Sequence, residues 1–265
     1  MLEGTNKLNE DLNSLVQASK NHCLQLNPKK CQLLLFGPTA SRKENLNLIN
    51  VFIDGERLEN SMSARNLGLL VDVDLRYTAH INNCIKKAFI NLKLIYNQRH
   101  LLNSELKKVL CDSLVLSNFS FCDAVYGPCL LEVDSKRIQL IQNHCVRLIG
   151  GIRKYDRGVT EKMREIGWLN MKERRCLHSL VLFYKIIFNK RPSYLYQKVK
   201  FRYDAHNLDL RHKQQLSPPL HRTAQYEKSF SYQVYYLYNK IPENLKGQNI
   251  VKFKKDIRNS ISIFL

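Results

Sequence analysis

Asp72 and Asp74, which are separated by one residue, form a pair of carboxylates that could do chemistry. Asp72 and Asp74 lie in the run LLVDVDL, so in an extended chain both carboxylates are on the same side of a strand. Carboxylate oxygens bind hard divalent cations, and a metal-dependent nuclease is one hypothesis for this pair. The pattern places no third carboxylate beside them, and aspartate is a common turn or capping residue where a strand enters a loop. We therefore predict a turn or capping role and no bound metal.

The eight cysteines could in principle form disulfides or bind zinc. No C-x-x-C pair occurs, and most of the cysteines lie inside apolar periodic segments, so we predict reduced thiols in the core. A zinc site from Cys176 with His178, or from His144 with Cys145, is an alternative, but neither has a second ligand pair at zinc-finger spacing. The eight are Cys23, Cys31, Cys84, Cys111, Cys122, Cys129, Cys145 and Cys176.

The charge of the chain indicates a polyanionic partner. Its 42 lysines and arginines against 23 aspartates and glutamates give a formal net charge of +19, and the excess is spread over most of the 265 residues. Lysines that neutralise phosphates release condensed counterions, so basic charge spread over folded elements favours a nucleic-acid backbone. Membrane binding would favour one concentrated amphipathic helix instead. We predict RNA, DNA or an RNA–DNA hybrid as the partner, and no membrane.

Neither a membrane span nor a secretion signal is expected. No apolar run approaches the length that crosses a bilayer, and the N-terminus MLEGTNKLNEDLN lacks a charged segment followed by an apolar one. The sequence therefore predicts an intracellular protein, cytoplasmic or nuclear. With 44% hydrophobic residues, the chain can bury a sizeable core as one large domain or two smaller ones.

The spacing of apolar residues changes along the chain. An amphipathic helix is predicted from Leu8 to Cys23 and should give way at Asn27-Pro28 to short strands, with a turn at Asp54-Gly55. From Thr78 onward the period is helical. The predicted strands are 31–36, 48–53, 57–58 and 67–71, and the predicted helices are 80–96, 104–126, 133–149 and 172–188.

Glycines and prolines divide the C-terminal part. Gly150-Gly151 and Arg191-Pro192 should each end a helix, and the polar, basic segment 201–222 is predicted to be a long loop. An aromatic-rich segment at 229–240 and a last amphipathic helix at 250–264 follow. Together these patterns predict an α+β fold, in which a small antiparallel sheet precedes a mainly helical remainder.

Short motifs follow one another along the chain in a definite order. In the first part, the motif L-N-x-x-K-[TSC] is matched by Leu26, Asn27, Lys30 and Cys31. The motif Y-L-G-[IV], followed by Asp and by His-Ile, is matched by Asn66 to Leu69, Asp72 and His80-Ile81. In the later part they are Gln142-Asn143 with Arg147, Gly167-Trp168-Leu169 with Arg174, Pro192 to Leu195, Arg222-Thr223, Phe230, Tyr238-Asn239 with Ile241-Pro242, and Phe253-Lys254. This order resembles the C-terminal part of reverse transcriptases from non-LTR, jockey-like (LINE-type) retrotransposons. Asn66, Gly167, Asn170 and Tyr238 depart from the family pattern.

The resemblance implies a domain organisation and an incomplete enzyme. It implies a palm remnant at 1–76, a helical thumb at 77–166 and a helical C-terminal domain at 167–265 that contains the basic loop 201–222. The family's Y-x-D-D aspartates, which hold Mg²⁺ at the primer end, would lie before residue 1, and the chain contains no Asp-Asp pair. The expectation is a chain that binds primer–template without polymerising. No cofactor is expected, because Mg²⁺ would belong only to the full-length parent enzyme.

Two sites in the first 76 residues take roles from the resemblance. Lys30 matches a lysine near the phosphates of the incoming nucleotide, where it would be a vestigial general acid; the alternative is a solvated lysine beside a helix end. Asn66, Leu67 and Gly68 match the primer grip, a hairpin whose backbone holds the primer, and Gly68 would permit close approach. The alternative there is a plain core strand with a glycine bulge.

Basic residues on the predicted helices would contact the phosphates of a duplex. Few acidic residues are interleaved with them, which favours duplex contact over a merely solvated face. Trp168 and the C-terminal tyrosines are predicted to be core anchors rather than platforms for stacked bases. The phosphate-facing candidates are Lys86, Lys87, Lys93, Lys107, Lys108, Lys136, Arg137, Arg147, Arg153 and Lys154.

A second functional hypothesis stays open at this point. The chain could be a repurposed basic helical protein that binds nucleic acid or serves as a scaffold without a polymerase. An in-frame upstream segment ending in Y-x-D-D would favour the retrotransposon interpretation. No Ser-His-Asp, Cys-His or glycine-rich phosphate-loop pattern indicates another class of enzyme.

Overall fold

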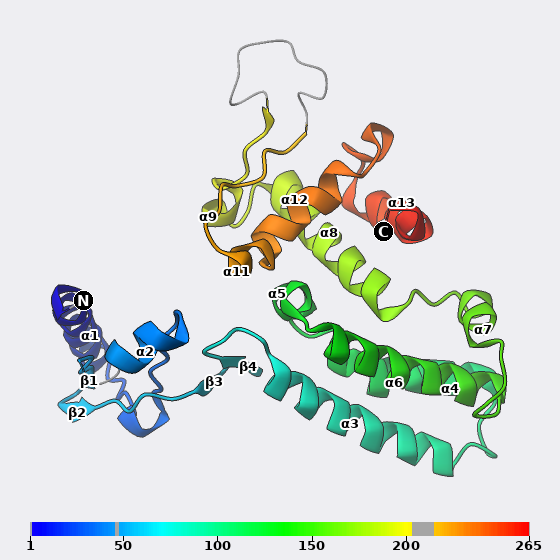
Figure 1. Cartoon of the computed structure of the whole chain (residues 1–265), viewed down its shortest axis with the longest axis horizontal. Coiled ribbons are helices and arrows are strands. Elements are labelled where there is room, and N and C mark those ends of the chain that lie inside the picture. The colour runs from blue at the N-terminus through cyan, green and yellow to red at the C-terminus, as the bar shows by residue number, and fades with distance from the viewer. Residues whose placement is uncertain (1, 46–47, 203–214, 265) are drawn as a thin grey trace. The chain divides into compact units, whose positions relative to one another are not determined.

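The protein is mostly helical in its computed structural model, which describes residues 2–45, 48–202 and 215–264 (Figure 1). The chain divides into two compact units, Met1–His80 and Ile81–Leu265, and each is considered by itself. The division predicted from the sequence, at 76 and 166, stays a prediction.

The first unit packs a helix on a short hairpin. Helix α1 (Leu2–Asn21) lies against strand β1 (Phe52–Ile53), which pairs with β2 (Glu56–Arg57). The side chain of Asn9 accepts a hydrogen bond from the backbone N–H of Phe52 (3.0 Å) and donates one to the carbonyl of Asn50 (2.9 Å). The small core of this unit contains Val16, Val51, Ile53 and Leu58. The unit also contains the 3₁₀ turn η1 (Pro28–Lys30) and helix α2 (Thr39–Asn45).

The predicted strands of this unit are mostly shorter in the structure. The prediction of a strand at 31–36 was wrong. This run forms only one parallel bridge, between Leu33 and Asn60, and no other described residue in it pairs with a strand. Of the strand predicted at 48–53, only Phe52–Ile53 pairs. The small antiparallel sheet is therefore two separate two-stranded pairs, β1 with β2 and β3 with β4.

The second hairpin has its turn where a strand was predicted to begin. Strand β3 (Ser63–Asn66) pairs with β4 (Leu69–Asp72), and Leu67-Gly68 is the two-residue turn between them. Both turn residues have positive φ, +47° at Leu67 and +96° at Gly68, which suits a tight hairpin turn and explains the glycine. Asn66 to Gly68 thus lie at an exposed hairpin tip, where the alternative of a plain core strand was wrong, whereas the residues from buried Leu69 onward do form a strand.

Leu67 is a poor residue for this turn, and its replacement should stabilise the hairpin. Its side chain is 91% exposed and its backbone is left-handed, a region that asparagine tolerates better than leucine. We expect Leu67→Asn to raise the free energy of unfolding by about 0.5–1 kcal/mol. Chemical denaturation monitored by circular dichroism would measure this, with the exposed substitution Leu220→Asn as a control expected to change little; a destabilised L67N would contradict the turn assignment.

Long amphipathic helices form most of the second unit. Those predicted at 80–96, 133–149, 172–188 and 250–264 are confirmed as α3 (Thr78–Asn97), α6 (Glu132–Gly150), α8 (Met171–Asn189) and α13 (Ile250–Phe264). Gly151 ends α6 in the left-handed conformation, as the Gly-Gly pair predicted. A capping box starts α8: the Asn170 side chain accepts from the Glu173 N–H, and the Glu173 carboxylate accepts from the Asn170 N–H (both 2.9 Å).

The single helix predicted at 104–126 was wrong. The segment is broken into α4 (Ser104–Leu110), the π-helical turn η2 (Cys111–Val115), the 3₁₀ turn η3 (Leu116–Phe119) and α5 (Asp123–Tyr126). Side chains of Ser113, Ser117 and Asn118 donate to the carbonyls of residues four positions earlier, at 2.5–2.8 Å, and so compete with the helical backbone. Cys122 then has a left-handed backbone, with a φ of +55°, directly before α5.

Shorter elements complete the second unit. They are η4 (Gly127–Cys129), α7 (Val159–Glu165), α9 (Ser193–Tyr196), α11 (Ala224–Glu227), α12 (Phe230–Asn239) and η5 (Glu243–Leu245). The aromatic-rich segment 229–240 thus forms α12, whose N-cap Ser229 accepts a hydrogen bond from the N–H of Tyr232. The predicted long loop 201–222 lies mainly outside the described residues.

Helices α8, α12 and α13 share one apolar core. Tyr184 of α8 stacks on Phe253 of α13 with ring centroids 3.7 Å apart, and Phe183 packs edge-on against Tyr238. The Asn239 side chain bonds both backbone groups of buried Leu216, at 2.8 and 2.9 Å. Trp168, Tyr235 and Tyr238 are buried, which confirms the prediction of core anchors for these three, but Tyr236 is 45% exposed, so the prediction was wrong there.

None of the eight cysteines forms a disulfide, and several are buried. All eight cysteines are free, and Cys84, Cys111 and Cys145 are fully enclosed, whereas Cys23 is exposed. Burial raises the pKa of the Cys84 thiol, so it stays neutral near pH 7. The predicted core thiols are thus confirmed for these three and wrong for Cys23.

Within the described ranges, no single helix has the length and apolar character to cross a bilayer. One bent pair of helical segments, Ser104–Phe119 with Asp123–Cys129, meets that criterion jointly, with a bend of 51°.

Candidate nucleic-acid interface

A hollow with basic walls lies among α3, α4 and α6, helices that Figure 1 shows side by side. Its volume is about 560 Å³, and we call it the basic hollow. It gathers five of the residues predicted to face phosphates. It is lined by Phe89, Leu92, Lys93, Tyr96, Arg99, Lys107, His144, Arg147, Leu148, Gly151, Ile152, Arg153 and Lys154.

One wall of the basic hollow is a face of α3. Phe89, Lys93 and Tyr96 are spaced by four and three residues, so they lie on the same side of the helix. Arg99 follows the end of this helix, and its guanidinium lies 4.2 Å from the centre of the Tyr96 ring. The helix and the turn after it thus present two aromatic rings together with the cations Lys93 and Arg99.

The opposite wall is the end of α6 and the turn that follows it. The Arg147 guanidinium donates to the carbonyls of Arg153 and Asp156, the latter at 3.1 Å, and so holds this turn against the helix. The left-handed Gly151 lets the chain leave α6 sharply, which brings Arg153 and Lys154 to the rim. The Ser104 hydroxyl at the start of α4 donates a hydrogen bond to the carbonyl of Ile149 near the end of α6 (2.8 Å), which ties α4 to α6.

The basic hollow combines positive charge with exposed apolar surface. None of the described residues that line it is acidic, whereas six are lysine or arginine. Phe89 and Tyr96 are 56% and 52% exposed, so both rings are accessible to a ligand. Cations that lack acidic partners suit phosphate oxygens, and exposed rings suit bases or sugars. The arrangement therefore suits a ligand that carries both phosphate groups and flat rings.

Five of the predicted phosphate contacts lie in the basic hollow and the others do not. The five are Lys93, Lys107, Arg147, Arg153 and Lys154. Lys86 and Lys87 are exposed on α3 outside it. Lys108 lines a different depression, together with Trp168 and Arg174.

Two predicted contacts on α6 have partners within the protein. Arg137 donates to the carboxylate of Asp134 (2.9 Å) and to the side-chain oxygen of Asn82 (2.8 Å), so its guanidinium fixes α6 to α3. Lys136 is exposed and lies 3.8 Å from Glu132. A neutralised cation releases fewer counterions on binding, so these two are weaker candidates than the basic hollow.

The remaining predicted site residues belong to the first unit. Lys30 is exposed at the end of η1, whose turn is capped by the Asn27 side chain. Asn66, Leu67 and Gly68 are exposed at the tip of the β3–β4 hairpin. An exposed hairpin tip is compatible with a grip on a strand, and the role of these four residues stays a prediction.

Asp72 has the structural role predicted for it. Its carboxylate accepts hydrogen bonds from the backbone N–H groups of Asp74 (3.1 Å), Arg76 (3.0 Å) and Tyr77 (2.6 Å), and so shapes the turn that leads into α3. Asp74 pairs with buried Arg42. Among the described residues, no group of three or more His, Cys, Asp or Glu side chains could hold a metal ion.

Four residues of the basic hollow were missed from the sequence: Phe89, Tyr96, Arg99 and His144. The spacing of Phe89 and Tyr96 around Lys93 was visible and could have identified two of them. His144 lies three residues before Arg147 on the same face of α6, which is a similar signal. Arg99 lies beyond the helix end, where periodicity carries no information.

Comparison of the chain with protein-family models, with curated proteins and with solved structures finds no match.

Proposed function

We propose that the protein binds the phosphate backbone of a nucleic-acid duplex through the basic hollow. The observation that carries the proposal is the hollow itself. Lysines and arginines from three helices and from the turns after α3 and α6 converge beside exposed aromatic rings, with no acidic residue among the described lining residues. Phosphate contacts position a duplex without reading its bases, so the binding should show little sequence preference.

The biological setting of this activity follows from the motif order. We propose that the chain is the C-terminal part of a reverse transcriptase of the non-LTR retrotransposon type, with the basic hollow in the role of a thumb that holds primer–template. The motif order given above supports this. The chain would then hold the duplex, while catalysis would depend on upstream aspartates that this chain lacks.

Salt titration tests the proposed binding. Arg147 donates its hydrogen bonds to the neighbouring turn, which leaves five cations of the basic hollow to contact phosphates. Each phosphate contact contributes about 0.9 to the slope of log K against log salt on B-DNA. Fluorescence anisotropy with a labelled primer–template should therefore give a slope between about −3 and −5. A scrambled duplex should give nearly the same affinity. A slope near zero would contradict the proposal and favour the scaffold hypothesis.

A further inference from the structure

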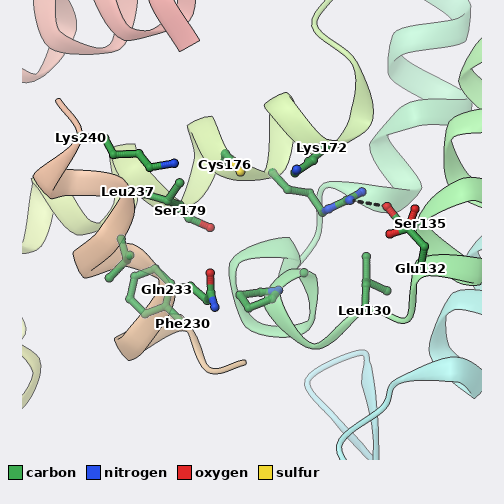
Figure 2. A pocket seen from close by; sticks show the side chains of 14 residues that line it. Leu130, Glu132, Ser135, Lys172, Cys176, Ser179, Phe230, Gln233, Leu237 and Lys240 are labelled. Carbon is green, nitrogen blue, oxygen red and sulfur yellow. Dashed lines mark hydrogen bonds between the residues drawn. The ribbon is translucent and has the colours of Figure 1, made fainter. Parts of the chain in front are cut away.

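A second cavity, of about 460 Å³, lies between η4, the start of α6, α8 and α12 and shares no residue with the basic hollow. Figure 2 shows the side chains that line it. Its volume is within the range of small-molecule sites. Polar and charged groups lie mainly on the α6 and α8 side, and apolar groups lie on α12 and around η4.

Arg175 is the unusual residue of this cavity. Its side chain is only 8% exposed, yet it has no ion pair among the described residues. One terminal nitrogen donates to the hydroxyl of Ser135 (3.0 Å; Figure 2), and the other, Nη1, has no hydrogen-bond acceptor in the part of the chain that the structure describes. The carboxylates of Asp123 and Glu132 act on this guanidinium through space but form no ion pair with it. A buried guanidinium with an unpaired nitrogen costs free energy, and an anion bound beside it would recover part of that cost.

The surroundings of Arg175 favour an anion over a cation. Lys172 and Lys240 also line the cavity, and in Figure 2 their amino ends point inward from opposite sides. Glu132 is the one acidic residue among the described lining residues, so the net charge there is positive. Burial lowers the pKa of Arg175, but an arginine stays charged at neutral pH. Burial also raises the pKa of the Cys176 thiol, so this lining residue is neutral and does not offset the cations.

The opposite side of the cavity suits an apolar body. Phe230, Val234 and Leu237 of α12 lie on one face, and Pro128 and Leu130 lie nearby. We propose that this cavity is a binding site for a small oxyanion, a phosphate or carboxylate, that carries an apolar group. The oxyanion would accept hydrogen bonds from Arg175 and would be attracted by the positive charges of Lys172 and Lys240. The apolar group would contact α12.

Isothermal titration calorimetry of the full chain tests this site. The probes are phenyl phosphate, phenylacetate and the neutral benzyl alcohol. Either anion should bind with a Kd of about 1 mM or tighter, and benzyl alcohol should bind at least about tenfold more weakly. A preference for phenyl phosphate over phenylacetate, or the reverse, identifies the oxyanion.

Variants show whether binding occurs in this cavity. Arg175→Met should weaken anion binding about tenfold or more, and Lys172→Ala with Lys240→Ala about fivefold. Lys185→Ala, an exposed change on α8 outside the cavity, should have no effect and is the matched control. If Arg175→Met does not fold, the double lysine variant decides. Equal affinity for the anions and benzyl alcohol, or undiminished anion binding by the lysine variant, would overturn the proposal.

Discussion

Replacing Lys93 and Lys154 with glutamate is expected to weaken duplex binding about 60-fold at 0.1 M salt. Both lysines line the basic hollow, from α3 and from the turn after α6, and neither has an acidic partner within the described ranges. Each lost phosphate contact removes about 0.9 logarithmic units of affinity at that salt concentration, so two remove about 1.8. Fluorescence anisotropy of a labelled duplex measures the change.

The control for this variant has the same change in charge at another place. Lys252 and Lys255 are exposed on α13 and do not line the basic hollow. Glutamate at both positions should lower affinity only a few-fold, through the long-range field of the protein, which salt screens over about 10 Å at 0.1 M. Equal losses in the two double variants would mean that net charge, not the hollow, drives binding.

Asp72→Ala is expected to reduce the protection of three backbone amides by about 150-fold, equivalent to about 3 kcal/mol. The Asp72 carboxylate holds the N–H groups of Asp74, Arg76 and Tyr77, and hydrogen bonds to a charged group each contribute about 1.5–3 kcal/mol without full additivity. The same turn contains Leu75 and Tyr77 with φ values of +53° and +57°, conformations that non-glycine residues adopt at a cost. Without the Asp72 side chain, the turn would keep the hydrogen bond from the Leu75 N–H to the carbonyl of residue 72 and the Arg42–Asp74 ion pair, but it would lose these three bonds to a charged acceptor.

Native-state hydrogen exchange over residues 69–80 measures this effect directly. Asp72→Asn retains one acceptor oxygen and should lose less protection than Asp72→Ala. Lys20→Ala serves as the control, because the ion pair of Lys20 with Asp54 is largely exposed and should contribute under 1 kcal/mol. Unchanged exchange at residues 74, 76 and 77 in Asp72→Ala would contradict the capping role and would restore the metal hypothesis for this aspartate.

The long helices could be predicted from sequence because periodicity and caps agree. For α6, the apolar stripe and the Gly150-Gly151 stop give both the helix and its end. The segment 104–126 has a similar stripe, but Ser113, Ser117 and Asn118 redirect backbone carbonyls, and a stripe does not report this competition. For 31–36, the missing information was a ladder partner, which is a tertiary property.

The candidate site could be predicted in composition but not in detail. The sequence identified a basic helical region, and half of the phosphate-facing candidates lie in one hollow. It could not show that Arg137 is engaged with Asp134 and Asn82, because the contact with Asn82 joins residues 55 positions apart. Likewise, nothing in the sequence marks Arg175 as buried, since lysines and arginines on an amphipathic helix are usually exposed.

The salt dependence of duplex binding by the two double glutamate variants tests the central claim most directly. Affinity of Lys93→Glu/Lys154→Glu, of Lys252→Glu/Lys255→Glu and of the wild type would be measured at several salt concentrations between about 50 and 200 mM. We predict that the slope of log K against log salt becomes shallower by about 1.8 for the basic-hollow variant, and stays at the wild-type value for the α13 variant. Equal slopes for all three proteins would contradict the claim that the basic hollow contacts phosphate.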